Sequence, residues 1–97
     1  MDIRGFIEGK KLKDLLSKKL TRREVETLSL YASGFTTKEI AEILNVSENT
    51  ARVHINNVYL KINIPEEANP KITLCLFYYI FRQEITKMGG FKNAKRS

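Results

Sequence analysis

Residues 36–62 constrain the fold more than any other part of this chain, because two stretches of helical apolar spacing flank a short polar interruption there. The apolar positions are Ile40, Ala41, Ile43 and Leu44 in the first stretch, and Ala51, Ile55, Val58 and Ile62 in the second. The interruption ends at Ser47, whose hydroxyl can accept a free backbone N–H of a following helix. The pattern predicts two helices joined by a tight turn, the second over residues 47–62.

The side of the second helix that faces away from its apolar stripe carries groups suited to base edges. Arg52, Val53 and Asn56 lie at positions i, i+1 and i+4, so they form one outward patch. Arginine can bind guanine, asparagine can bind adenine, and an apolar methyl can contact thymine. We therefore expect this helix to lie in the major groove of double-stranded DNA. An ordinary solvated helix face is the alternative.

Further polar residues around this patch are candidates for contacts to the DNA backbone or to flanking bases. Thr37 and Lys38 begin the first helix, where free N–H groups and the helix dipole favour a phosphate. Lys61 could bind a phosphate or simply complement the dipole at the end of its helix. The remaining candidates within the second helix are Asn49, Thr50 and Asn57.

Residues 20–64 contain several short motifs whose spacing along the chain is informative when they are taken together. They are Leu20-Thr21-x-Arg23-Glu24, Leu28, Ala32-x-Gly34, Thr37-Lys38-Glu39-Ile40-Ala41, Val46-Ser47-x-x-Thr50-x-Arg52-x-His54 and Lys61-Ile62. In these motifs the chain resembles the LuxR-type (GerE/NarL-like) helix-turn-helix domain of bacterial transcription regulators. The resemblance implies a sequence-specific DNA-binding regulator in which Arg52, Val53 and Asn56 read bases. Family members usually have Pro, Val and Gly where this chain has Arg22, Ala51 and Asn63.

The rest of the chain completes an all-α fold. Residues 10–19 place leucines on one face and lysines around it, which predicts a short amphipathic helix. Thr21 and Glu24 form a capping box for a helix that ends at Gly34. Asn69-Pro70 begins a last helix that runs to about Lys87 and ends at Gly89-Gly90. We expect a four-helix LuxR-type domain over residues 20–87, preceded by a basic extension (1–19) that contains the short helix, and followed by a basic tail (88–97).

The last predicted helix is apolar almost all round, whereas a surface helix needs only an apolar stripe. Part of its aromatic surface is therefore expected to form a protein interface. In LuxR-type domains this helix often pairs two protomers, so the resemblance implies a two-fold homodimer with Phe77, Tyr78 and Phe81 at the interface. The alternatives are coverage of this helix by Leu12, Leu15 and Leu16 of the N-terminal helix, or contact with a different protein.

The charge of the chain is concentrated at its ends. The formal net charge is +6, yet residues 24–86 carry more acids than bases. Twelve of the seventeen cations precede Glu24 or follow Thr86. They are either solvated tails or basic arms that bind phosphates, in which case DNA affinity should fall steeply with salt.

The sequence offers little for other classes of function. His54 is the single histidine and Cys75 the single cysteine, too few for a metal site or a nucleophile–base pair. We expect a partly buried structural His54, no enzyme activity, no cofactor and no metal. The lone cysteine fits the reducing cytoplasm, and the chain shows neither a signal peptide nor an apolar run long enough to cross a membrane.

These patterns together predict a cytoplasmic, sequence-specific transcription regulator that binds double-stranded DNA as a dimer. A protein-binding modulator that engages another transcription regulator, or RNA polymerase, through the aromatic helix at 70–87 is the alternative. The acidic balance of residues 24–86 favours that alternative. A sigma-like region 4 has similar helices but fits the motifs around His54 less well. Only nineteen residues precede Leu20, so the chain is either regulated without an upstream receiver or ligand-binding domain or is a fragment of a longer protein.

Overall fold

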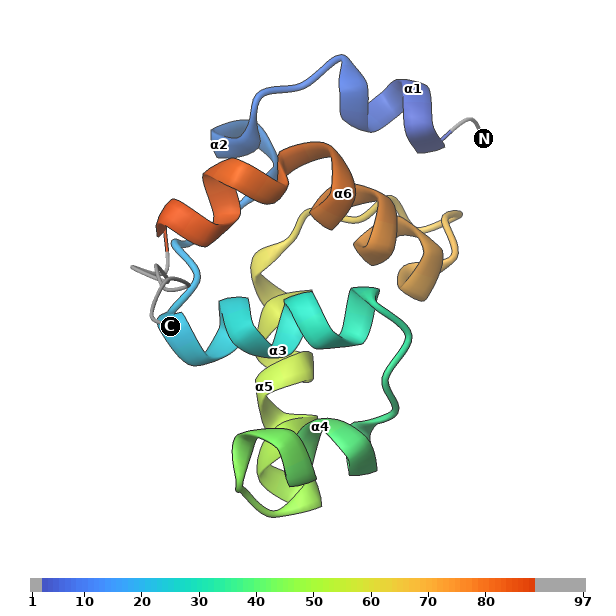
Figure 1. Cartoon of the computed structure of the whole chain (residues 1–97). Helices are drawn as coiled ribbons and strands as arrows, with labels where there is room; N and C mark the ends of the chain where they lie inside the picture. The colour runs from blue at the N-terminus through green and yellow to red at the C-terminus, as the bar shows by residue number, and fades with distance from the viewer. Residues whose placement is uncertain (1–2, 89–97) are drawn as a thin grey trace.

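The computed structural model describes residues 3–88, and that range folds into six helices with one isolated antiparallel bridge (Figure 1). The helices are α1 (Ile3–Glu8), α2 (Leu12–Leu15), α3 (Arg22–Ala32), α4 (Thr37–Leu44), α5 (Glu48–Lys61) and α6 (Pro70–Met88). The all-α prediction is therefore confirmed. Within the described residues no helix is long and apolar enough to cross a membrane. The predicted basic tail and the Gly89-Gly90 stop lie outside the described residues, apart from Met88.

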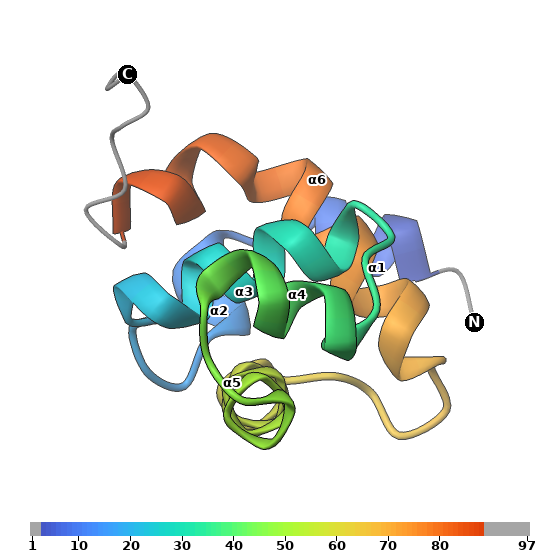
Figure 2. The same ribbon diagram turned by 60° about the horizontal axis from the view of Figure 1, so that its bottom comes forward.

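Helix α3 lies in the middle of the molecule, with α6 on one side and α4 with the start of α5 on the other (Figures 1 and 2). Two apolar clusters follow from this arrangement. The larger cluster joins α1, α2, α3 and α6 to the end of α5, and the smaller one joins α4 to α5 through Ile40, Ala41 and Ala51. The predicted helix-turn-helix is thus held against the rest of the chain by α3.

The three central helices begin at hydrogen-bonded caps. The Thr21 hydroxyl accepts from the Glu24 N–H at 3.2 Å, and the Glu24 carboxylate accepts from the Thr21 N–H at 2.9 Å, as the predicted capping box requires. Thr36 forms the same box for α4, and Ser47 accepts from the Thr50 N–H at 3.0 Å to begin α5. The predicted caps at Thr21 and Ser47 are confirmed, and Thr36 is the cap of α4.

The turn between α4 and α5 depends on Asn45. Its φ of 58° is left-handed, which asparagine tolerates better than most residues. The other left-handed residue in the described range is Gly34, with φ 103°, directly after the end of α3. Asn63, which stands where the family usually has glycine, is not left-handed. Its N–H instead donates to the Leu15 carbonyl at 2.8 Å.

The N-terminal extension is more ordered than its sequence indicated. Helix α1 was not predicted, because residues 3–8 show no clear apolar period, yet Ile7 is only 1% exposed and packs in the larger cluster. The helix predicted over 10–19 is limited to α2. The chain then turns extended at Leu16, which forms the bridge with Ile62. Pairing with the segment after α5 therefore replaces the second half of the predicted helix.

Three of the four aromatic residues of α6 point into the protein, and Tyr79 is exposed. Phe77, Tyr78 and Phe81 are 1%, 6% and 8% exposed, and the Tyr78 hydroxyl donates to the Ser29 hydroxyl at 3.0 Å. Burial within one chain contradicts the expectation that these three side chains form a dimer interface. The physical reason is that α3 and α1 pack against α6, and that Leu12 and Leu15 of α2 join the same cluster, as in the alternative that used Leu12, Leu15 and Leu16.

Candidate nucleic-acid interface

Helix α5 has one buried and one exposed side. Ala51, Ile55 and Val58 are buried at helical spacing and fix the orientation of the helix. On the opposite side Arg52, Val53 and Asn56 are all exposed, as the sequence pattern indicated. The structure therefore brings the predicted base-contact residues together as one outward patch.

Contacts at both ends hold α5 in place. Near its start, Ala51 packs against Ile40 and Ala41 of α4, and the two small alanines allow the helices to approach closely. Near its end, the Tyr59 ring meets the Tyr31 ring of α3 edge-on, with centroids 6.4 Å apart and the hydroxyls 3.4 Å apart. Because both ends are fixed, the outward patch has a defined position on the surface.

The polar groups of the patch are available for a ligand. Arg52 forms an ion pair with Glu48 one turn earlier, at 3.1 Å, and both side chains are about half exposed. Such exposed pairs contribute about 0.3–0.5 kcal/mol, so Arg52 can exchange this partner at little cost. The Asn56 amide forms no side-chain hydrogen bond within residues 3–88.

The predicted flanking residues around this patch differ in how exposed they are and in whether their side chains already form hydrogen bonds. Lys38 and Asn49 are exposed, whereas Thr37 and Asn57 are half-buried. The Thr50 hydroxyl accepts from the Ser47 hydroxyl at 2.9 Å, so it already supports the start of α5. Lys38 and Asn49 are therefore the most accessible of the predicted flanking residues.

Lys61 is not free to bind a phosphate. Its Nζ donates to the Glu24 carboxylate at 2.6 Å and to the Lys19 carbonyl at 3.1 Å, and the Lys61 and Glu24 side chains are only 18% and 6% exposed. Burial raises the pKa of Glu24, but hydrogen bonds from Lys61 and Thr21 outweigh burial and hold that pKa below its ordinary value. Lys61 thus ties the end of α5 to the start of α3, which corrects its assignment as a backbone or flanking DNA contact.

One exposed residue of α5 was missed in the sequence. Leu60 is 78% exposed and extends the outward side, since it lies seven residues after Val53 and four after Asn56. The sequence could have indicated this exposure, because Leu60 does not share the helical spacing of the buried residues Ile55, Val58 and Ile62. An exposed leucine on this side provides an apolar contact for a ligand that covers the whole length of α5.

His54 is half-buried, in keeping with the structural role expected for it. No group of three or more potential metal-binding side chains gathers anywhere in residues 3–88.

Comparison with known proteins identifies the same region. Residues 18–69 match the family model described as "Bacterial regulatory proteins, luxR family". The chain is 47% identical to the nitrate/nitrite response regulator protein NarP of Escherichia coli over 45 aligned residues. These residues make up 46% of this chain and 21% of NarP. It is 34% identical to the transcriptional regulatory protein LnrK of Bacillus subtilis over 70 aligned residues. These residues make up 72% of this chain and 31% of LnrK. It is 42% identical to the transcriptional regulatory protein DegU of Brevibacillus brevis over 45 aligned residues. These residues make up 46% of this chain and 19% of DegU. The chain thus spans between a fifth and a third of the length of these relatives. No solved structure matches the chain.

Proposed function

Because this chain belongs to the luxR family of bacterial regulatory proteins, we propose that it is a sequence-specific DNA-binding transcription regulator that reads the major groove with α5. The observation that carries the proposal is the outward patch of Arg52, Val53 and Asn56 on a helix whose other side is fixed in the core. Arg52 exchanges Glu48 for a base, Asn56 binds a second base, and Val53 contacts an apolar base edge.

Contacts to the sugar–phosphate backbone position α5 in the groove. Lys38 and the start of α4 face one phosphate, and Asn49, Thr50 and Asn57 contact phosphates or neighbouring bases. The Ser17 hydroxyl donates to the carbonyl of Lys61, so the neighbouring Lys18 lies beside the end of α5 and supplies further positive charge. Lys61 makes no phosphate contact, because Glu24 already neutralises it.

A homodimer on paired half-sites uses the exposed side of α6 and not its buried aromatic residues. Ile72 and Tyr79 are 56% and 51% exposed, and with half-buried Leu76 they lie at positions i, i+7 and i+4. A two-fold axis would place this stripe against its own copy. The stripe is short, so we expect pairing mainly when two protomers occupy adjacent half-sites.

The similarity to transcriptional regulators does not favour the alternative of a protein-binding modulator. The chromosome lies in the bacterial cytoplasm, so a DNA-binding regulator acts there, and the free Cys75 fits that reducing compartment.

The test is selection of bound sequences from a pool of random DNA duplexes. Wild type should enrich one defined motif, and Arg52→Ala should lose that enrichment. Arg4→Ala is the matched control, because Arg4 is an exposed arginine on α1 that pairs with Glu8 in the same i, i+4 manner. Absence of enrichment by wild type would contradict the proposal, as would equal enrichment by Arg52→Ala.

A further inference from the structure

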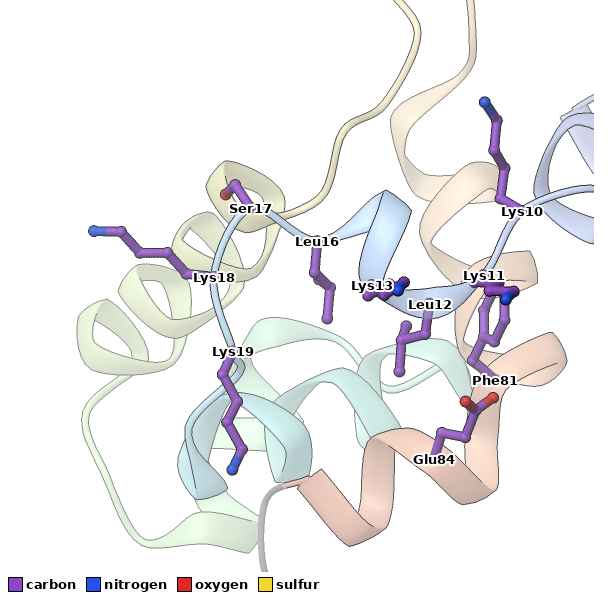
Figure 3. Close-up of a pocket in the computed structure, with 10 residues that line it drawn as sticks. All are labelled: Lys10, Lys11, Leu12, Lys13, Leu16, Ser17, Lys18, Lys19, Phe81 and Glu84. Carbon is purple, nitrogen blue, oxygen red and sulfur yellow. The ribbon is translucent and has the colours of Figure 1, made fainter.

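A hollow of about 650 Å³ lies between α2 and the second half of α6 (Figure 3). Its apolar wall consists of Leu12, Leu16 and Phe81. The backbone creates this space in two places. Helix α6 departs from helical geometry at Phe81, with φ −109° and ψ 20°, and the chain leaves α2 in extended form at Leu16. The side chains of Leu12 and Leu16 point into the space between the two elements.

The edge of this hollow is basic. Five lysines line it, namely Lys10, Lys11, Lys13, Lys18 and Lys19. Lys10, Lys18 and Lys19 direct their ammonium groups away from it, which leaves Lys11 and Lys13 as the charges beside Leu12 and Phe81. Neither of these two ammonium groups forms an ion pair within the described residues. The single carboxylate on the lining belongs to Glu84.

DNA bound by α5 does not account for this site. The hollow is lined by α2 and the second half of α6, and α6 lies on one side of α3. Helix α4 and the first half of α5, which carries Arg52, lie on the other side (Figures 1 and 2). Lys11 and Lys13 on α2 therefore face a different part of the surface from the groove-reading helix. Neither ion pairs nor the proposed DNA contacts satisfy their charges.

We propose that this hollow binds a small amphipathic anion, with a carboxylate or phosphate head beside Lys11 and Lys13 and an apolar body against Leu12, Leu16 and Phe81. The volume lies within the range of about 300–1,000 Å³ that accommodates one small molecule. An inorganic anion gains no binding free energy from contact with the apolar wall, and exposed lysines bind such an anion only weakly. A neutral apolar molecule gains nothing from the ammonium groups. The combination selects a molecule that carries both features.

The test is a titration followed by the backbone amide resonances of the isotope-labelled full chain. The probe is decanoate below its micelle-forming concentration. Decyltrimethylammonium has the same chain with the opposite charge, and acetate and inorganic phosphate are anions without the chain. We expect decanoate to shift the amides around Leu12, Leu16 and Phe81 in a saturable manner, and the other three probes to bind at least about tenfold more weakly.

Charge variants test the edge of the site. Lys11→Glu combined with Lys13→Glu should weaken decanoate binding at least about tenfold at low salt, and Glu84→Gln should tighten it about twofold. Lys71→Glu is the matched control, since Lys71 lies at the other end of α6, about 15 Å along the helix from Phe81. It should change binding less than about twofold. The dispersion of the amide spectrum reports whether each variant is folded.

Any one of the following results would overturn the proposal. Equal binding of decanoate and decyltrimethylammonium would show an unselective apolar surface. Equal binding of acetate or phosphate would show ordinary counter-ion condensation on lysines. Saturable shifts located on α5, or unchanged decanoate affinity in both charge variants, would place the ligand elsewhere. An acidic peptide that shifts the same amides more tightly than decanoate would assign the surface to a protein partner instead.

Discussion

Replacing Lys61 by methionine removes the charge that offsets a buried carboxylate while it keeps the packing of the side-chain stem. In the wild type Glu24 is 6% exposed and its carboxylate lies 2.6 Å from Lys61 Nζ. Breaking a buried pair costs about 3–5 kcal/mol, and the 18% exposure of Lys61 reduces this to about 2–4 kcal/mol. A domain of this size has about 5–15 kcal/mol of stability, so the variant should remain folded but melt about 10–25 °C lower.

The pH dependence of this variant should have the opposite sign to that of the wild type. In the wild type the pKa of Glu24 is held below its ordinary value of 4.5, so its stabilisation is present above that pH and is lost as the pH falls through the lowered pKa. Without Lys61, burial dominates and raises the pKa of Glu24, so protonation favours the folded state. Acidification from neutral pH should therefore stabilise Lys61→Met and destabilise the wild type.

Two further variants complete this test by thermal unfolding followed by circular dichroism. Glu24→Gln added to Lys61→Met should restore stability to within about 1 kcal/mol, because glutamine still accepts the Thr21 N–H without a buried charge. Lys38→Met, at an exposed lysine, should leave the melting temperature unchanged but reduce the salt slope of DNA binding by about one. A Lys61→Met protein of wild-type stability and reduced salt slope would refute the structural role of Lys61.

Three other perturbations test separate parts of the account. Glu48→Gln releases Arg52 and removes a carboxylate near DNA, so it should tighten binding to specific and random duplexes alike by about twofold in fluorescence anisotropy; weaker binding to both would contradict this. Ile72→Glu should remain folded by circular dichroism yet lose cooperative binding to a duplex with two half-sites, while Phe77→Glu should unfold; unchanged cooperativity would reject the α6 stripe as the dimer surface. Deletion of residues 2–9 removes buried Ile7 from the core and should cost about 2–5 kcal/mol in chemical denaturation; a deletion variant as stable as wild type would mean that α1 does not cover α6.

Local chemistry made the central helices predictable from the sequence. A helix start depends on a side chain and a backbone N–H about three residues apart, so Thr21, Thr36 and Ser47 could be recognised without knowledge of the tertiary fold. The outward position of Arg52, Val53 and Asn56 follows from the spacing of the buried residues on the same helix. Both features are determined by residues that lie within one or two helical turns of each other in the sequence.

Contacts between distant segments were not predictable in the same way. The partner of Lys61 lies 37 residues away at Glu24, so its local context indicated only a cation near a helix end. Residues 72–81 of α6 are apolar almost all round, and their exposed side is decided by α3 and by α1, whose sequence shows no period. The prediction of Phe77, Tyr78 and Phe81 at a dimer interface was wrong because it required knowing where α1 and α2 pack.

The most direct test of the central claim is a thermodynamic cycle between Arg52 and the base it reads. Binding of wild type and Arg52→Ala is measured on the selected duplex and on duplexes with each base pair of the half-site replaced in turn. If α5 reads the major groove, wild type should lose about 1–3 kcal/mol at one position, where Arg52→Ala loses almost nothing, and both proteins should respond alike elsewhere. An Arg52→Ala protein that keeps the wild-type pattern of discrimination at every position would contradict the account.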